Sequence, residues 1–327
     1  MKAMAGVSTI ATSITSLAGH LLRGASDGRL LVLIYHRVRA QPDSMFPREL
    51  HADTFEWQVE LIKRFCNPIA LSEGVSLLEH GRLPPRSIAV TFDDGYADNA
   101  TVALPILRRH AVPATFFVAT GFLDGGRMWN DTVIEFIRGA PGDSVNLSSV
   151  GLGSEKLGPP AVRGQLAEKI LRHVKHLHPA QRSVRVEALS GGLDRPLPDD
   201  LMMTSVQLRW LVDAGMEIGA HTVNHPILVT LSDEEAKMEI ADSREVLQRI
   251  TGKPVTSFAY PNGRPGDDFG SRDRDLVESL GFERAVSTLR GVATCNSDIF
   301  QLPRFGPWGH TPEKWLAHLL LAFRSQA

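Results

Sequence analysis

Short apolar runs alternate with helix-like stretches along most of the chain, and this alternation constrains the fold more than any other feature. Runs with the length and apolar content of buried strands lie at 30–36, 87–94, 113–120, 216–222, 256–261 and 283–288, with a weaker run at 299–305. Amphipathic stretches between them lie at 53–65, 97–110, 204–214, 232–250 and 271–280. Strands joined by helices pair in parallel and carry the helices on the outside of the sheet. The sequence therefore predicts an α/β fold, as a barrel or as a doubly wound sheet.

One long segment interrupts this alternation. Residues 121–203 contain no obvious core strand, and 138–160 are rich in Gly, Pro and Ser, whereas 161–190 again have a helical pattern. We interpret the segment as an insertion in a connection from strand to helix, where α/β enzymes carry lids and substrate-binding walls. The predicted organisation is an N-terminal helical segment over 1–28 and one domain over 29–327 that contains the insertion.

The first residues of the chain also allow other interpretations. Apolar residues recur there at spacings of three and four, which favours a helix packed on the domain. A secretory signal and a membrane-surface helix are the alternatives. No apolar run reaches the length of a transmembrane span, so we expect no stable membrane span and a cytoplasmic rather than an exported protein.

Charge and cysteine content narrow the classes of ligand. The net charge is −2 at pH 7, so the chain has no basic field for a nucleic-acid backbone and we expect no nucleic-acid partner. The two cysteines, Cys66 and Cys295, form no metal-binding motif. We expect both to be small core residues, although one disulfide between them remains open.

Polar side chains follow the predicted strands at the points where the strands end. They are His36 after the first run, Asp93 and Asp94 after the second, His221 and His225 after the fourth, Tyr260 and Asn262 after the fifth, and Arg304 near the last. Each alone has a simpler explanation, such as a core histidine, a turn or a surface ion pair. The carboxyl ends of parallel strands share one face, so together these residues predict a site.

The adjacent carboxylates of Asp93 and Asp94 require an explanation, because two neighbouring anions repel each other. Two imidazoles and one carboxylate form a set that suits Zn²⁺ or a similar divalent ion and leaves positions for water and substrate. A dication beside the pair lets both carboxylates stay ionised. One aspartate can then bind the metal while the other accepts a proton from water.

The motifs TFDDG, HTVNH and FAYPNG, in that order, resemble those of the polysaccharide deacetylase family, the NodB-homology domain, and the likeness runs from about 30 to 305. The resemblance implies a distorted (β/α) barrel, here of about seven parallel strands with a long insertion after the third. It implies removal of N-acetyl or O-acetyl groups from a carbohydrate polymer with the help of a divalent metal, and we expect an N-acetylated carbohydrate as the substrate and Zn²⁺ in preference to Co²⁺, Ni²⁺ or Mn²⁺. At the matching positions of this sequence, the resemblance implies that Asp93 is the catalytic base and that the metal ligands are Asp94, His221 and His225.

The chain departs from the family pattern at the residue that orients the base. Many members have Arg-x-Pro-Tyr as the third motif, and alignment on Pro261 places Ala259 where that arginine would stand. Arg304 is our candidate to replace it. Tyr260 and Asn262, within the same motif, are expected to bind substrate.

The general acid is the second departure. Many members supply a histidine from Leu-x-His on the last strand, and no such sequence closes the last strand here. The segment LIYHRV on the first strand resembles this motif instead, as in members that act on poly-N-acetylglucosamine. We therefore predict His36 as the acid, with His310 as the alternative.

The function expected from these residues is hydrolysis of N-acetyl groups on a carbohydrate polymer or oligosaccharide. Hydrolysis of another small or cyclic amide on the same fold is one alternative, and a non-catalytic carbohydrate-binding relative is another. A glycosidase is disfavoured, because side chains on adjacent residues rarely straddle a sugar with the ~5–9 Å gap that glycoside hydrolysis needs.

Overall fold

The computed structural model describes residues 27–191, 193, 195–306, 309 and 311–324. The predicted N-terminal helix and His310, the alternative acid, thus lie outside the described residues. Within these ranges, no helix combines the length and apolarity needed to cross a bilayer.

Seven parallel strands form the barrel, and each of the seven predicted runs overlaps one of them. In spatial order they are β1 (Leu30–Tyr35), β3 (Ser87–Phe92), β4 (Ala114–Val118), β7 (Glu217–Ala220), β8 (Ser257–Ala259), β9 (Arg284–Arg290) and β10 (Leu302–Arg304). The amide of Ile34 donates to the Phe305 carbonyl at 3.1 Å, and that of Phe305 to the Val32 carbonyl at 2.8 Å, which joins β1 to the end of β10. A two-residue strand, β2 (Asn67–Pro68), lies beside β3. The distorted (β/α) barrel is confirmed, and the doubly wound sheet is not observed.

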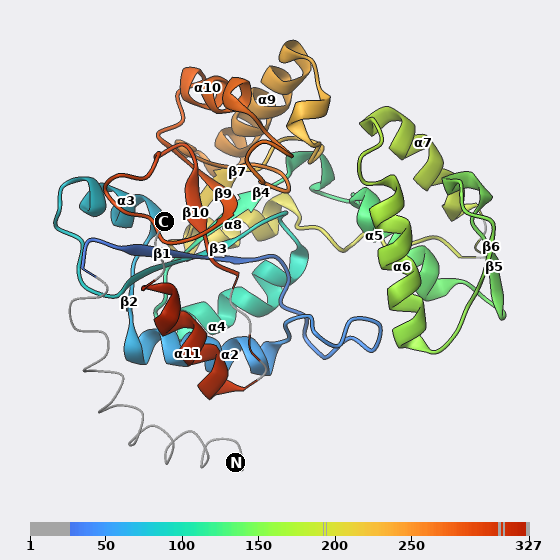
Figure 1. Cartoon of the computed structure of the whole chain (residues 1–327), viewed down its shortest axis with the longest axis horizontal. Coiled ribbons are helices and arrows are strands. Elements are labelled where there is room, and N and C mark those ends of the chain that lie inside the picture. The colour runs from blue at the N-terminus through green and yellow to red at the C-terminus, as the bar shows by residue number, and fades with distance from the viewer. Residues whose placement is uncertain (1–26, 192, 194, 307–308, 310, 325–327) are drawn as a thin grey trace.

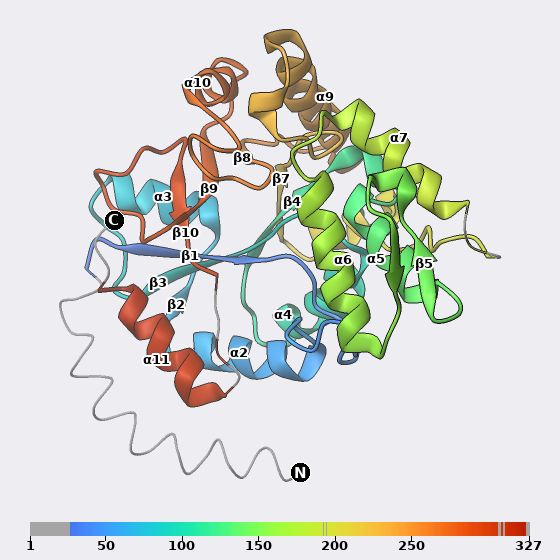
Figure 2. The same ribbon diagram turned by 45° about the vertical axis from the view of Figure 1, so that its right-hand side comes forward.

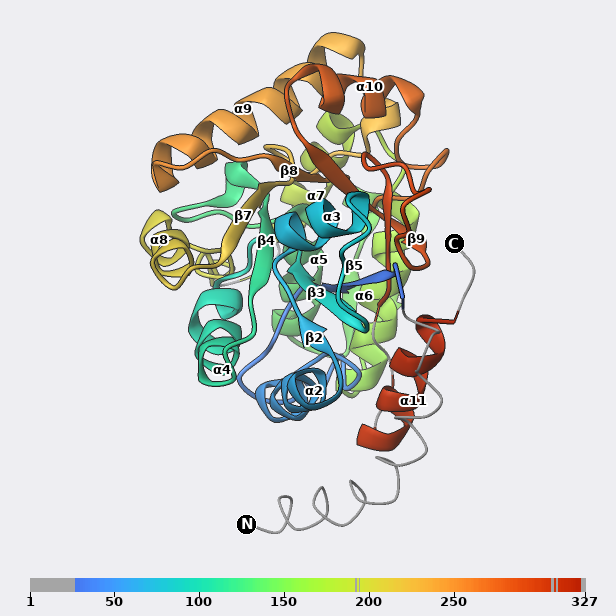
Figure 3. The same ribbon diagram turned by 90° about the vertical axis from the view of Figure 1, so that its left-hand side faces the viewer.

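Helices surround the barrel, as the view onto one end shows (Figure 3). They are α2 (Ala52–Phe65), α3 (Leu71–Glu79), α4 (Leu104–Arg109) after a π-helical turn (Asn99–Ala103), α8 (Ser205–Asp213), α9 (Asp233–Thr251), α10 (Ser271–Ser279) and α11 (Pro312–Ala322). The five predicted helical stretches are confirmed, whereas α3 and α11 were not predicted. In Figure 3, α3 crosses the end of the barrel that faces the viewer.

The two faces of the strands have different surroundings. Leu31 and Leu33 of β1 face the outer helices, whereas Leu30 and Val32 face the barrel interior and pack with α3, as the two-residue period of a strand requires. The interior becomes polar toward the carboxyl ends of the strands, where Arg304 is fully buried. Apolar side chains thus fill the end near α3, and the opposite end carries the polar residues.

The insertion forms a second layer beside the barrel, on the right in Figures 1 and 2. It consists of α5 (Trp129–Gly139), β5 (Ser144–Asn146), β6 (Ser154–Lys156), α6 (Pro160–Val174) and α7 (Pro179–Ser190), and these elements share an apolar cluster separate from that of the barrel. The antiparallel β5–β6 pair and α5 were not predicted. The loop after β1 holds the insertion, since Asp43 pairs with Arg138 of α5 at 2.7 Å. The insertion therefore stands over the carboxyl ends of the strands.

The insertion leaves and rejoins the barrel at one place. The amide of Asp124, before α5, donates to the Met203 carbonyl at 3.2 Å. Its outer part also begins and ends together, because a Cβ added to Gly139 would lie 3.7 Å from the Leu193 side chain.

Both cysteines are free thiols, and no disulfide joins them. Cys66 is buried as expected, but Cys295 is exposed, so the core prediction is wrong for Cys295.

Candidate active site

The carboxylate of Asp93 lies inside the barrel just beyond β3 and is 2% exposed. Arg304, at the end of β10, donates two parallel hydrogen bonds to it, Nη1 to Oδ1 at 2.7 Å and Nη2 to Oδ2 at 2.6 Å. The Arg304 Nε donates to the Ser287 carbonyl at 2.8 Å, which fixes the guanidinium plane. Burial alone would raise the pKa of Asp93, but Arg304 outweighs it and holds the pKa below its usual range. The chain thus brings together the predicted base and the predicted substitute arginine, 211 residues apart.

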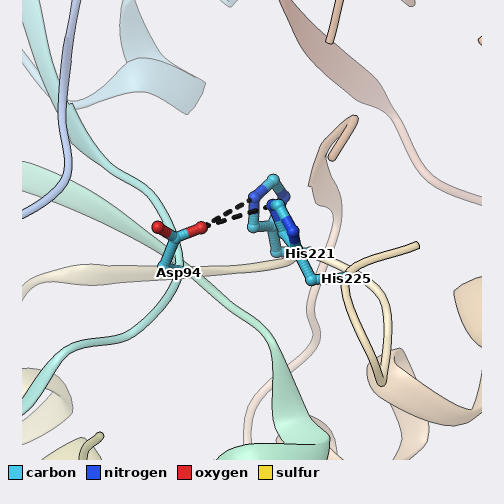
Figure 4. A group of neighbouring side chains, drawn as sticks. All are labelled: Asp94, His221 and His225. Carbon is cyan, nitrogen blue, oxygen red and sulfur yellow. Dashed lines mark ion pairs between the residues drawn. The ribbon is translucent and has the colours of Figure 1, made fainter. Parts of the chain in front are cut away.

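The carboxylate of the second aspartate, Asp94, points toward the two histidines (Figure 4). Asp94 Oδ1 lies 3.5 Å from His221 Nε2 and 3.4 Å from His225 Nε2. This oxygen is buried and has no hydrogen-bond partner among the described residues. The three atoms therefore converge on one point, as the sequence predicted for a metal site.

A hydrogen bond from Nδ1 of His221 leaves the other ring nitrogen, Nε2, available to bind a metal. His221 Nδ1 lies 2.7 Å from the Ala259 carbonyl at the end of β8. A carbonyl accepts only, so Nδ1 carries the proton by assignment from this bond, and Nε2 has the lone pair. Proteins usually orient a metal-binding histidine in this way, through a hydrogen bond from the ring nitrogen that does not bind the metal.

Charge at the three side chains also suits a cation. Burial opposes ionisation of Asp94, but the neighbouring imidazoles prevail and hold its pKa below its usual range. Burial lowers the pKa of His225 to about 4, so this imidazole is neutral at pH 7. Burial would also lower the pKa of His221, yet the nearby carboxylates raise it. A proton and a divalent cation thus compete for the position beside His221.

Unusual backbone geometry places these ligands. Asp94 and His225 have φ angles of 76° and 52°, and Thr222 has a φ of 64°. Few residues other than glycine adopt this left-handed region, and such residues gather at functional sites. The Thr222 hydroxyl accepts a hydrogen bond from the His225 amide at 3.1 Å and closes the turn between the two histidines.

Glu239 of α9 holds the outer side of the same turn and was not recognised in the sequence. Its Oε2 accepts from the amides of Val223 at 2.9 Å and Asn224 at 2.8 Å, and its Oε1 accepts from Asn224 Nδ2 at 2.7 Å. The carboxylate thus accepts hydrogen bonds from two backbone amides of the turn between the two histidines. Glu239 lies within an ordinary amphipathic helix, so its spacing gave no signal.

Removing Glu239 is expected to weaken metal binding. We expect Glu239→Ala to raise the dissociation constant for Zn²⁺ by about 10–100-fold, because partners that orient metal ligands have effects of this size. Titration calorimetry on the metal-depleted protein measures the change. Glu245→Ala is the control, since Glu245 lies on the same helix and pairs only at the surface with Arg249. Equal affinities in the two variants would contradict this role for Glu239.

His36 follows β1 and is exposed at the mouth of the barrel. Its carbonyl accepts from Asn99 Nδ2 at 2.8 Å, which fixes the backbone. Burial raises the pKa of Asp93, whereas Arg304, His221 and then His36 lower it, so the His36 imidazole lies on the same side as the site. Its role as the acid stays a prediction.

The two residues predicted to bind substrate lie in different surroundings. Tyr260 is fully buried, its ring stacks on Phe269, and its hydroxyl donates to the Phe300 carbonyl at 3.0 Å. A side chain with no exposed surface and a bonded hydroxyl does not contact substrate, so the prediction is wrong for Tyr260. Asn262 is half-buried in the turn after β8, with a φ of 59°, and its role stays a prediction.

Comparison of the sequence with known families and proteins gives consistent matches. The model of the family described as polysaccharide deacetylase matches residues 80–139 and 189–285. The YxkH protein of Bacillus subtilis is 20% identical over 277 residues, which cover 84% of this chain and 70% of that protein. A poly-β-1,6-N-acetyl-D-glucosamine N-deacetylase of Staphylococcus aureus is 27% identical over 131 residues, 33% of this chain and 45% of that enzyme.

Solved structures with this fold cover nearly the whole chain. The deacetylase PplD of Streptococcus pyogenes, solved with acetate, superposes with a TM-score of 0.60 at 20% identity and covers 89% of this chain and 98% of its own. IcaB of Ammonifex degensii has a TM-score of 0.56 at 19% identity, with 91% and 97% covered. At these identities the likeness establishes the fold.

Proposed function

Since the chain belongs to the polysaccharide deacetylase family, we propose that it is a metal-dependent hydrolase that removes N-acetyl groups from a carbohydrate polymer or oligosaccharide. One observation carries the proposal: Asp94, His221 and His225 converge beside the buried Asp93–Arg304 pair. The Staphylococcus aureus relative is a poly-N-acetylglucosamine N-deacetylase by name, which supports a glycan of N-acetylglucosamine as the substrate class.

The residues of the proposed metal site fit a divalent ion, with Zn²⁺ as the first candidate and Co²⁺, Ni²⁺ or Mn²⁺ as alternatives. Asp94 Oδ1 and the Nε2 atoms of the two histidines would hold it. An ion bound there supplies Lewis acidity for the acetyl carbonyl and acidifies a water molecule.

Asp93 and His36 divide the proton transfers of the proposed reaction. The oxygen of water attacks the acetyl carbon, and its proton passes to the carboxylate of Asp93. Arg304 keeps this carboxylate ionised and fixes its plane through the paired hydrogen bonds. When the carbon–nitrogen bond breaks, the His36 imidazolium gives its proton to the sugar nitrogen. The products are acetate and an amino sugar.

Release of acetate tests the proposal directly. We expect the purified protein to release acetate from N-acetylglucosamine oligomers, to lose this activity after chelation, and to regain it when Zn²⁺ or Co²⁺ is added back. An O-acetylated sugar and a small cyclic amide, assayed in parallel, identify the bond that is cleaved. His221→Ala is the control for a contaminating enzyme and should stay inactive after metal addition. Hydrolysis of the cyclic amide alone, or no hydrolysis with the metal bound, would overturn the proposed function.

A further inference from the structure

The segment that follows Asp94 pairs with the returning end of the insertion. The amide of Ala97 donates to the Leu201 carbonyl at 2.9 Å, and the amide of Met203 donates to the Gly95 carbonyl at 2.9 Å. Tyr96 lies between these bonds and faces Met202 in an antiparallel bridge. The loop that carries both aspartates is thus bound to the insertion along its backbone.

The side chain of Tyr96 makes a second connection, to the start of α5. Tyr96 is 3% exposed, and its hydroxyl donates to Asp131 Oδ1 at 3.3 Å. The Nδ2 group of Asn130 lies 3.4 Å from the same hydroxyl and donates to it. Hydrogen bonds that are shielded from water hold their groups more firmly than exposed ones.

The loop that carries His36 reaches the same carboxylate. Arg37 directly follows His36, and its guanidinium lies over the Tyr96 ring, 4.3 Å from the centroid. Its Nη1 is 4.0 Å from Asp131 Oδ1, and its Nε donates to Asp98 Oδ2 at 2.8 Å. Asp131 therefore faces both segments that supply the proposed proton-transfer residues.

Asp131 is a costly residue at this position. Its side chain is almost fully buried, and Oδ2 has no hydrogen-bond partner among the described residues. Burial, with the charge of Asp94 adding to it, raises the pKa of Asp131 to about 7. A buried polar atom without a partner lowers the stability of the fold, and an apolar residue would avoid this cost. Stability alone thus gives no reason for a carboxyl group here.

We propose that Asp131 is a positioning residue, which sets the Asp93–Asp94 loop through Tyr96 and the His36 loop through Arg37. The inference rests on the proposed function, because it concerns the same site. It makes α5 of the insertion part of the catalytic apparatus rather than only a wall beside it.

Two variants of Asp131 and one control test the inference. Asp131→Ala removes the acceptor of the Tyr96 hydroxyl, whereas Asp131→Asn retains an acceptor oxygen at the same place. Asp43→Asn is the control, because Asp43 is also buried and joins α5 to the barrel through Arg138. It weakens attachment of the insertion without removing a partner of Tyr96.

We expect Asp131→Ala to lower kcat about 10- to 100-fold, as small misplacements of catalytic groups do, with KM and the dissociation constant for Zn²⁺ unchanged. Asp131→Asn should recover most of kcat. Tyr96→Phe should lower kcat like Asp131→Ala, and the double variant should lose no more than either single variant. Asp43→Asn should lower the melting temperature and leave kcat unchanged.

A structural role alone would lower the melting temperature of Asp131→Ala and leave its kcat intact, and this result would overturn the inference. Equal losses of kcat in Asp43→Asn and Asp131→Ala would do the same. The parent protein separates this failure from failure of the proposed function. If the parent releases acetate and Asp131→Ala matches it, only the positioning role fails, whereas an inactive parent with its metal bound refutes the function itself.

Discussion

Asp93→Asn is expected to lower the turnover number by a factor of about 10²–10⁴ while the protein still binds its metal. The amide keeps the shape of the carboxylate but cannot take the proton of water. The substitution also leaves the buried Arg304 without its anion, so we expect a loss of stability of about 3–5 kcal/mol. Turnover is therefore measured at a temperature where circular dichroism shows the variant to be folded, with metal content determined on the same sample.

Asp94→Asn provides the matched comparison, because the two aspartates are adjacent and both are buried. Asp94 contacts the two histidines rather than Arg304. We expect this variant to lose metal affinity first, by at least about 10-fold, and to lose turnover as a consequence. Added metal should restore part of the turnover in Asp94→Asn and none in Asp93→Asn. Equal loss of metal in both variants would show that the two carboxylates do not have separate roles.

His36→Ala is expected to lose amide hydrolysis by about 10²–10⁴-fold and to keep most of its activity on an activated ester such as 4-nitrophenyl acetate. An amine leaves only when it is protonated, whereas nitrophenolate leaves without a proton. His36 is exposed at the end of β1, so its removal should not disturb the core or the metal site. His80→Ala is the control, since His80 is an exposed histidine at the end of α3.

The ratio of amide to ester activity decides the identity of the acid. His310→Ala should hydrolyse both substrates at rates close to those of the parent. A selective amide defect in His310→Ala, with His36→Ala affected only in its melting temperature, would assign the acid to His310 instead.

The strands and the convergence of Asp94, His221 and His225 could be predicted because their signals are local. A buried parallel strand is a continuous apolar run, and the polar residue that ends it lies at the carboxyl edge by topology alone. The likeness of TFDDG and HTVNH to a known family then selected Asp94, His221 and His225 as the expected metal ligands, and this role stays a prediction. Arg304 was predicted only as a candidate, and the paired hydrogen bonds to Asp93 are consistent with that choice.

The features that were missed depend on contacts between distant segments. Glu239 bonds to a turn 15 and 16 residues before it, and Asp131 bonds to Tyr96, 35 residues before it, so neither contact belongs to a local motif. Tyr260 was placed in the site because it ends a strand, but the strand period turns its ring into the core. The helix α3 was missed because Gly74 weakens its helical pattern. Glycine lets α3 pack closely there, since a Cβ would lie 3.1 Å from the Leu30 and Ile69 side chains and would require them to shift.

The outer part of the insertion starts beside Gly139 and returns beside Leu193, and this closeness bears on how the protein can evolve. A segment whose two ends meet can change its length at little cost in chain entropy, because each doubling of a closed loop costs only about 0.6 kcal/mol, although any replacement must still cover the apolar face of α5. The family match omits 140–188 and keeps α5. Residues 140–188 are thus a stretch of chain separate from the segments that carry Asp93, Asp94, His221 and His225. Under the proposed function, a change of length or sequence in 140–188 can reshape the surface beside the site while those four residues stay the same.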